Sequence, residues 1–371
     1  MRDSSLFIGM ISGTSRDGVD VVLVSFDSDR PSLHSSLCLS YPPDLAEILK
    51  NMVETGQRPA AGELLEVDDR LAAFFGEAAL TLLSEAGIGA SSVTAIGSHG
   101  QTVWHQPNGP DPETIQLGSP EKIAHQTGIV TVGDFRQADM KAGGQGAPLA
   151  PLLHRALFKP AEGTRMVLNL GGIANISVVA SDGSVLGFDT GPANCLLDVW
   201  IQKQLAEPFD RAGAWSAGGA VDQLLLLELM NDPYFKRPPP KSTGVEYFNL
   251  RWLSGRERIE SIAPRDVQAT LAQLTASTVA SAVAPYSPAD VLVCGGGAHN
   301  LDLLERLRGL LPGCPVESTT GHGLDPDNVE AVLFAWLARE RIAGRQQDTR
   351  DITGARAPIL LGDVFDAVTG K

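Results

Sequence analysis

The sequence predicts an α/β protein built from two related lobes. The chain has 371 residues, which is more than one ordinary hydrophobic core holds and enough for two domains. Apolar runs of strand length alternate with helical patterns along it. Two hairpins with glycine in the turn lie about one domain length apart, which predicts a duplicated domain with a ligand between the halves.

The first lobe opens with a hairpin. Residues 7–10 and 19–26 are apolar runs joined by a turn rich in glycine, hydroxyls and acids. An amphipathic helix over residues 63–85 and a short buried strand over residues 93–97 follow. Residues 133–151 have turn composition without periodicity, which predicts a domain junction.

The second lobe repeats this pattern. A hairpin over residues 165–179 is followed by a helix over residues 266–284, and a strand over residues 290–294 runs through a glycine turn into another helix. We expect the last long helix to begin with Asp325 as N-cap and Pro326 at its first position.

Composition excludes several classes of protein. The formal net charge is −15 and no cluster of Lys and Arg appears, so a nucleic-acid partner is not expected. The sequence contains no run of about 18 apolar residues, so a membrane span is not expected. The N-terminus lacks the apolar core of a signal peptide. We therefore expect a cytoplasmic protein. The four cysteines form no C-x-x-C pair, which argues against a zinc site or a disulfide framework.

The common catalytic motifs are absent from the sequence. It contains no Walker phosphate loop, no protein-kinase motif set, no metalloprotease H-E-x-x-H and no G-x-S-x-G elbow. Two hairpins and a late glycine turn instead fit an ATPase of the superfamily of acetate and sugar kinases, Hsp70 and actin. The alternative is that each glycine turn merely connects strands.

Seven strings make the interpretation specific. In chain order they are residues 9–20, 98–105, 133–136, 169–175, 188–194, 294–300 and 325–331. Together they closely resemble the signatures of the anhydro-N-acetylmuramic acid kinase family. Ile11 and Arg16 depart from the expected pattern, in which Met and an apolar residue stand at these positions.

The resemblance implies a two-lobed, duplicated ribonuclease-H-like (actin-like ATPase) fold with a central cleft for ATP and substrate. It also implies an ATP- and Mg²⁺-dependent enzyme that opens 1,6-anhydro-N-acetylmuramic acid with water and phosphorylates O6. The products are N-acetylmuramic acid 6-phosphate and ADP, in peptidoglycan recycling and amino-sugar catabolism. A homodimer is the implied assembly, and a small amino sugar the implied partner.

Asp189 is the candidate catalytic residue. Water that attacks an anomeric carbon must lose a proton, and a carboxylate is the natural base. Asp189 follows the apolar residues 185–188 and precedes Thr190 and Gly191, so we expect it at a strand end facing the cleft. The resemblance carries the general-base role to the same position. The alternative is an Asp that stabilises a turn before glycine.

The ATP site is expected to draw on three glycine-containing segments. The candidates are Gly13, Thr14, Ser15, Arg16, Asp17, Gly18, Val19, Asp20, Gly171, Gly172, Asn175, Gly295, Gly296 and Gly297. Hydroxyls and backbone N–H groups of the first hairpin would hold the phosphates. Asp17 or Asp20 would hold Mg²⁺ through water; the alternative for either is turn stabilisation.

Arg136, Glu330 and His99 are the substrate candidates besides Asp189. Arg136 suits a bidentate grip on the lactyl carboxylate, unless it pairs with Asp134 or Asp139. Glu330 begins a helix that looks buried, so it would bind a sugar hydroxyl or position Arg136, or simply favour the helix N-terminus. His99 would line the sugar pocket with Trp104 and His105, or pack in the core.

We expect residues 1–132 and 345–371 to form the first lobe and residues 133–344 the second. Two rival functions remain open at this point. One is another small-molecule kinase or phosphatase of the same superfamily. The other is a nucleotide-switch protein that processes no metabolite.

Overall fold

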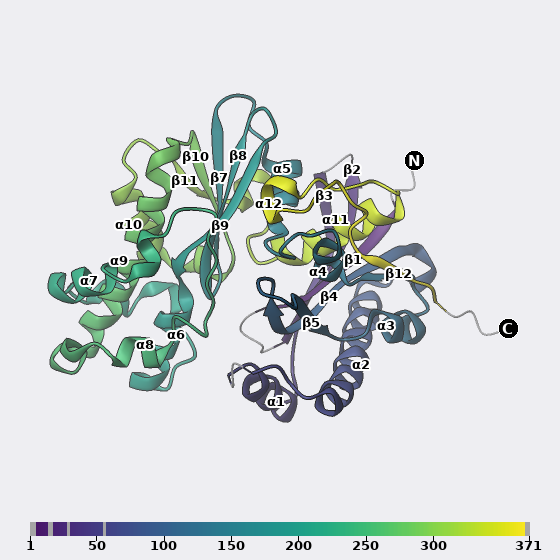
Figure 1. Cartoon of the computed structure of the whole chain (residues 1–371), viewed down its shortest axis with the longest axis horizontal. Helices are drawn as coiled ribbons and strands as arrows, with labels where there is room; N and C mark the ends of the chain where they lie inside the picture. The colour runs from purple at the N-terminus through teal and green to yellow at the C-terminus, as the bar shows by residue number, and fades with distance from the viewer. Residues whose placement is uncertain (1–4, 14–17, 28–29, 55–56, 368–371) are drawn as a thin grey trace. The chain divides into compact units, whose positions relative to one another are not determined.

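The computed structural model describes residues 5–13, 18–27, 30–54 and 57–367 of the chain. The chain forms two compact units. The first contains Met1–Leu157 and Asn328–Lys371, and the second contains Phe158–Asp327. Figure 1 labels the helices and strands of both units.

The first unit is built on a sheet with the strand order β12-β6-β4-β1-β2-β3, with β5 added to β4. Strands β1, β2 and β3 form an antiparallel meander, whereas β4 runs parallel to both β1 and β6. The strands are β1 (Leu6–Ser12), β2 (Gly18–Asp27), β3 (Arg30–Ser40), β4 (Val93–Gln106), β5 (Glu113–Leu117), β6 (Thr131–Gly133) and β12 (Asp363–Phe365).

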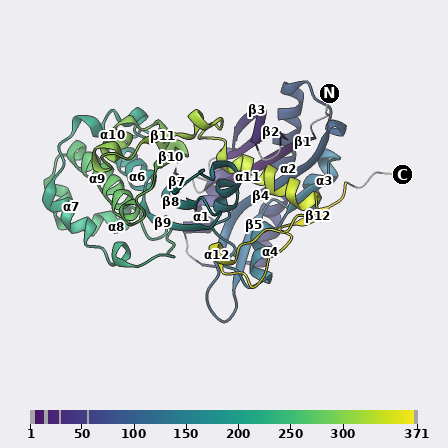
Figure 2. The same cartoon turned by 90° about the horizontal axis from the view of Figure 1, so that it is seen from above.

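This unit contains seven helices among the described residues. They are α1 (Pro43–Glu54), α2 (Ala61–Ala86), α3 (Pro120–Thr127), α4 (Phe135–Lys141), α5 (Ala150–Phe158), α11 (Val329–Ile342) and α12 (Arg350–Thr353). Helices α2 and α11 pack on opposite faces of the sheet. Ile8 and Met10 of β1 belong to the same buried cluster as the apolar stripe of α2. Gly9 lies between them in the strand and so points to the opposite face. There a Cβ would overlap the carbonyl group of Ala331, because α11 packs directly on the strand backbone (Figure 2).

The second unit repeats the connectivity of the first. Its sheet has the order β11-β10-β7-β8-β9. Strands β7, β8 and β9 form an antiparallel meander, and β10 runs parallel to β7 and β11. The strands are β7 (Thr164–Leu170), β8 (Ile173–Ala180), β9 (Val185–Pro192), β10 (Asp290–Cys294) and β11 (Val316–Ser318). The two sheets confirm the predicted duplicated, ribonuclease-H-like α/β fold.

The helices of the second unit lie mostly between β9 and β10. They are α6 (Asn194–Leu205), α7 (Gln223–Met230), α8 (Leu250–Ser254), α9 (Pro264–Val283) and, after β10, α10 (Leu301–Leu310). Val279 of α9 and Leu303 of α10 pack with Leu168 and Val293 of the sheet in one buried cluster. A separate cluster around Phe248 supports the irregular chain between α7 and α9.

Several local expectations are wrong. The last long helix begins at Val329 with Asn328 as its N-cap. Asp325 instead accepts the N–H of Asp327 at 3.0 Å, a local turn that competes with helix initiation. Residues 133–151 contain α4 and the start of α5, which are too short to show a clear period in the sequence. Asp189 lies within β9, three residues before its end, and not at a strand terminus.

The compact units also differ in extent from the lobes expected from the sequence. Residues 133–157 and 328–344 belong to the first unit, whereas we expected them in the second lobe. Residues 328–344 belong to the first unit because α11 packs on β1 and β4, where it contributes ten buried residues.

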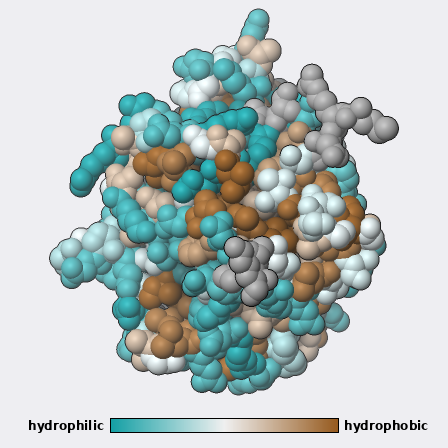
Figure 3. Space-filling model, turned by 90° about the vertical axis from the view of Figure 1, so that its right-hand side faces the viewer, coloured by the Kyte–Doolittle hydropathy of each residue, from teal (hydrophilic) through white to brown (hydrophobic). Residues whose placement is uncertain are grey.

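The surface carries isolated apolar side chains. Leu33 and Leu65 are 44% and 68% exposed, and Figure 3 shows hydrophobic groups lying among hydrophilic ones on the face that it draws. Scattered groups of this kind are normal for a folded surface. Within the described parts of the chain, we find no helix with the length and apolar character needed to cross a bilayer.

Candidate functional site

The first hairpin has a fixed base. The Ser12 hydroxyl lies 2.7 Å from the carbonyl oxygen of Gly18 and 2.6 Å from Oε1 of Gln101. Nε2 of Gln101 donates to the carbonyl oxygen of Gly13 at 3.4 Å. Four of the expected phosphate contacts lie outside the described residues: Thr14, Ser15, Arg16 and Asp17. Sequence reasoning missed Ser12 and Gln101 as anchors, although both lie in the strings that carry the resemblance.

Val19 and Asp20 follow Gly18 at the start of β2 and have different surroundings. The Val19 side chain is buried in the core, so only its backbone could contact a ligand. Asp20 is half-buried and lies opposite Ile11 in the hairpin register. Among the residues described, no group of three or more His, Cys, Asp or Glu is placed to hold a metal ion. A Mg²⁺ ion that keeps several waters and binds phosphates through one or two carboxylates is compatible with Asp20 at this position.

The second hairpin is tied to the start of α6. The carbonyl oxygen of Gly172 accepts the N–H groups of Ala193 and Cys195, at 3.0 and 3.1 Å, and that of Gly171 accepts the N–H of Asn194 at 3.1 Å. The Asn194 side chain also donates to Gly171, at 2.9 Å. The orphan N–H groups of the helix end thus fix the turn between β7 and β8.

A row of polar residues crosses the second sheet. Asn175 of β8 lies opposite Asn169 of β7 on one side and Asp189 of β9 on the other. Residues in register share a face of the sheet, so these three side chains lie in one row. The structure therefore brings Asn175 and Asp189, both expected at the site, next to Asn169, which we did not single out.

The late glycine turn packs against this row. Gly295 has a φ of 77°, and a Cβ there would overlap Oδ1 of Asn169. A Cβ on Gly297 would lie 2.5 Å from that of Leu170, whereas the space beside Gly296 is open. Gly295 and Gly297 thus allow close approach to the end of β7. Two of the three expected nucleotide-contacting segments therefore lie together in the second unit.

Asp189 is held on three sides by one later segment. Its N–H donates to the carbonyl oxygen of Lys241 at 2.9 Å, and its own carbonyl oxygen accepts the Tyr234 hydroxyl at 2.8 Å. Its Oδ2 accepts the backbone N–H of Thr243 at 2.9 Å. The expected alternative, an Asp that merely caps a turn, does not describe this geometry, because the carboxylate is bonded to a residue 54 positions away. The signal for these partners in the sequence is only the aromatic- and proline-rich composition of residues 231–249.

Arg136 and His99 form a pair in the first unit. Nε of Arg136 donates to Nε2 of His99 at 2.8 Å, and Nδ1 of His99 lies 3.0 Å from the carbonyl oxygen of Gly100. A neutral ring with its proton on Nδ1 satisfies both contacts. Burial, and then the charge of Arg136, lower the pKa of His99 well below its usual range. His99 is thus a neutral acceptor that orients the guanidinium.

One nearby acid, Asp139, and a second histidine, His105, complete this region. Asp139, considered as a partner of Arg136, accepts the hydroxyls of Thr349 and Thr353 at 2.7 and 2.8 Å. Nδ1 of His105 lies 3.0 Å from the Thr114 hydroxyl. Burial, and then Arg136, lower the pKa of His105 to about 4. Both histidines therefore carry no charge at neutral pH.

Glu330 lies in the first turn of α11 and is exposed. The helix around it is largely buried, as predicted, but Glu330 itself is not part of the buried face. Its position favours a carboxylate, because the helix dipole is positive there. Arg136, His99 and Glu330 belong to the first unit and Asp189 to the second.

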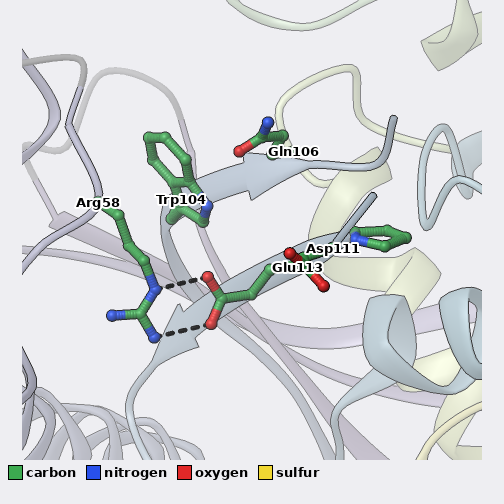
Figure 4. A pocket seen from close by; sticks show the side chains of 6 residues that line it. Arg58, Trp104, Gln106, Asp111 and Glu113 are labelled. Atoms are coloured by element: carbon green, nitrogen blue, oxygen red, sulfur yellow. Dashed lines mark hydrogen bonds and ion pairs between the residues drawn. The ribbon is translucent and has the colours of Figure 1, made fainter. Parts of the chain in front are cut away.

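A pocket of about 490 Å³ lies beside the β4–β5 hairpin. It is lined by Arg58, Trp104, Gln106, Asp111, Pro112 and Glu113. Arg58 pairs with both carboxylate oxygens of Glu113, at 2.6 and 2.7 Å, as the dashed lines in Figure 4 show. Trp104, expected beside the sugar with His99 and His105, lines this pocket.

Comparison with known proteins agrees with the sequence strings. The family model for anhydro-N-acetylmuramic acid kinase matches residues 5–367. The chain is 47% identical over 369 residues to the anhydro-N-acetylmuramic acid kinase of Xanthomonas campestris pv. campestris (strain 8004), covering 98% of each protein. It is 45% identical over 368 residues to that of Vibrio cholerae, covering 98% of this chain and 99% of the relative. Among solved structures, the activator of 2-hydroxyisocaproyl-CoA dehydratase from Clostridium difficile with bound ADPNP is 13% identical, with a TM-score of 0.47 over 92% of this chain and 99% of that one. By its sequence over nearly its whole length, the chain belongs to the anhydro-N-acetylmuramic acid kinase family.

Proposed function

We propose that this protein is an ATP-dependent kinase of 1,6-anhydro-N-acetylmuramic acid that yields N-acetylmuramic acid 6-phosphate and ADP. Membership of the family over residues 5–367 supports the reaction. The structural observation that carries the proposal is the Asp189 carboxylate, held by the Thr243 N–H at 2.9 Å in a row of polar side chains beside the glycine turn. A fixed, ionised carboxylate is what the hydrolytic half of the reaction requires.

The proposed mechanism needs one carboxylate. Asp189 accepts a proton from water while the water oxygen forms a bond to C1 of the sugar. The C1–O6 bond breaks, and O6 attacks the γ-phosphorus of ATP, so ADP leaves. Because the phosphoryl group takes the developing charge on O6, no protein acid is needed to protonate it. This differs from ordinary glycosidases, which use a pair of acids.

The nucleotide would be held by the glycine-containing segments. In our proposal, residues 13–20 and Gly171–Gly172 contact the phosphates, and Gly295–Gly297 contacts adenosine. The open space beside Gly296 supports this assignment. Mg²⁺ would supply charge neutralisation at the phosphates, with Asp17 or Asp20 reached through water. The ordered base of the first hairpin at Ser12 and Gln101 would keep its loop aligned.

The substrate carboxylate would be gripped by Arg136. Its guanidinium is oriented by the neutral His99 through the 2.8 Å contact, and bidentate recognition of a carboxylate requires such orientation. Glu330, exposed at the start of α11, would accept a hydrogen bond from a sugar hydroxyl. We also propose that the two lobes close on the substrates and exclude bulk water.

The cellular setting follows from the proposed reaction. The enzyme would act in the cytoplasm, where ATP is available, on a sugar released during peptidoglycan recycling. It would work as a homodimer, as the family resemblance implies. Neither nucleic acid nor a membrane takes part in the proposed reaction.

A coupled assay of ADP release tests the proposal. The purified protein is incubated with ATP and Mg²⁺, and with either 1,6-anhydro-N-acetylmuramic acid or plain N-acetylmuramic acid. We expect turnover with the anhydro-sugar only, and loss of that turnover in Asp189→Asn with retained binding of both substrates. Turnover of plain N-acetylmuramic acid alone, or ATP hydrolysis independent of any sugar, contradicts the proposed substrate. Near-normal kcat in Asp189→Asn contradicts the role of the carboxylate.

A further inference from the structure

We propose that the segment of residues 234–243 positions Asp189 for catalysis and that the ammonium group of Lys241 stabilises its carboxylate form. This rests on the proposed role of Asp189 as general base. The segment belongs to the connection between β9 and α9, and all of its contacts described below lie within the second unit.

The first step is the geometry of the contacts. Asp189 has three polar groups of its own fixed by the segment: its N–H by the carbonyl of Lys241 at 2.9 Å, its carbonyl by the Tyr234 hydroxyl at 2.8 Å, and its Oδ2 by the Thr243 N–H at 2.9 Å. A donor to the carboxylate favours its ionised form. Contacts to both backbone and side chain restrict the rotation of the group that must meet water.

The second step is what holds the segment itself. Asp232 is 7% exposed and accepts hydrogen bonds from the Tyr234 N–H, the Tyr247 hydroxyl and Nε1 of Trp252, each at 2.9 Å. Arg256 lies 3.6 Å from the same carboxylate. Aromatic rings pack around this centre, so Tyr234 is anchored at its backbone while its hydroxyl reaches Asp189. A buried carboxylate that accepts three hydrogen bonds in this way favours a single arrangement of the segment.

The third step concerns charge. Nζ of Lys241 lies 4.6 Å from the centre of the Tyr234 ring and 3.3 Å from the Tyr234 carbonyl oxygen. Burial, and then Arg237, lower the pKa of Lys241, whereas Asp189 raises it. Arg237 also lies over the Tyr234 ring, at 5.6 Å. Among the described residues of this segment, Asp189 raises the pKa of the Tyr234 phenol and of Lys241. Interaction energies are mutual, so the cation that Asp189 stabilises also stabilises the Asp189 carboxylate.

The test compares the pH dependence of kcat/KM in three variants, with 1,6-anhydro-N-acetylmuramic acid as substrate. Lys241→Met removes the cation, so the pKa of Asp189 rises and the acid limb of the profile moves to higher pH, by roughly 0.5 to 1 unit. Lys241→Arg restores a cation and brings the limb back towards that of the wild type. Lys236→Met is the matched control: it removes a cation of the same segment that contacts Asn231, at 2.7 Å, and leaves the limb in place.

A fourth variant separates positioning from charge. Tyr234→Phe removes one neutral hydrogen bond to the Asp189 carbonyl, so kcat falls about threefold to tenfold while KM for the sugar and the acid limb stay unchanged. A fall in thermal stability with unchanged kcat would mean that Tyr234 only supports the fold, and would overturn the positioning role.

The charge role is overturned if Lys241→Met keeps the wild-type acid limb, or if Lys241→Arg shifts it as far as Lys241→Met does. If turnover is too low for a pH profile, the pKa of Asp189 is measured from its carboxyl ¹³C resonance, which is assigned by its loss in Asp189→Asn. A pKa of Asp189 that is the same in Lys241→Met as in the wild type then overturns the charge role. Failure of the proposed function is distinguishable, because it appears as wild-type protein without sugar-dependent turnover.

Discussion

Replacing Gly97 by alanine tests how closely α11 packs on the first sheet. Gly97 does not have a positive φ, so alanine suits its backbone and only the space beside it opposes the change. A Cβ there would overlap the carbonyl oxygen of Phe334, and it would lie 2.6 Å from the carbonyl carbon of Phe334 and 3.0 Å from Cβ of Ala338. Ordinary carbon contacts are about 3.5–4.0 Å, so relieving the contact with the carbonyl carbon alone requires α11 to move away from β4 by about 1 Å, and the carbonyl oxygen requires more.

The cost of that movement follows from the packing. An added methylene in a filled core typically costs 1–3 kcal/mol. Backbone atoms of a helix cannot rotate aside as a side chain can, so we expect Gly97→Ala to lower the free energy of unfolding by about 3 kcal/mol. Urea unfolding followed by circular dichroism measures this.

Gly62→Ala is the matched control for this measurement. No atom lies within 4 Å of the position of its added Cβ, and it lies in α2, where alanine is favoured by up to about 1 kcal/mol. Equal stability changes in Gly97→Ala and Gly62→Ala would refute the packing argument. A loss confined to Gly97→Ala, together with a higher KM for the sugar, would connect the α11 position to Glu330.

Two further predictions concern His99 and Asp198. His99→Leu removes the acceptor for the Arg136 guanidinium, so we expect KM for the sugar to rise about tenfold, as for loss of a hydrogen bond to a charged group, with KM for ATP unchanged. His99→Gln keeps an acceptor, so its KM for the sugar should rise less. Equal increases of KM in the two variants would contradict the orienting role. Burial, and then Asp210, raise the pKa of Asp198 to about 7, so the folded protein binds an extra proton between the unfolded pKa near 4 and pH 7, and stability falls as pH rises through that window. Asp198→Asn should therefore raise the free energy of unfolding by about 1–3 kcal/mol at pH 8 and by little at pH 4. Urea unfolding at both pH values measures this difference. An increase in stability that does not depend on pH would contradict the raised pKa of Asp198.

Much of the fold could be predicted from the sequence because local patterns determine it. Both hairpins combine apolar strands with glycine turns, and β10, its glycine turn and α10 follow the expected order. The register then aligns Asn175 with Asp189, because β8 and β9 both extend beyond the apolar runs that predicted them.

The partners of Asp189 could not be predicted in the same way. Tyr234 and Thr243 are 45 and 54 positions away from it, and they lie in an irregular segment without periodicity. Their placement depends on the buried Asp232 and the aromatic rings around it, which is a tertiary network. Nothing in the spacing of these residues indicates which of them faces β9.

The start of α11 was mistaken for a similar reason. Asp325 and Pro326 have the residue types of a helix N-terminus, but the Asp325 carboxylate accepts the N–H of Asp327 instead. Two competing local hydrogen-bond patterns fit the same residues, and packing of the helix on the sheet selects one of them. Glu330, expected early in a buried helix, lies in the first turn of α11 and is exposed.

The packing of α11 also shows how the two units depend on each other in the chain. Gly9 and Gly97 are register partners on adjacent strands, and together they form a backbone surface that only a closely packed helix covers. That helix follows the entire second unit in the sequence, so the first unit cannot cover this surface until residues 158–327 have been synthesised. The second unit is therefore an insertion in the first and not a tandem repeat of it, although their sheets share one connectivity. It follows that β1, the strand leading into the first hairpin, is stabilised by a helix that comes after the proposed catalytic base.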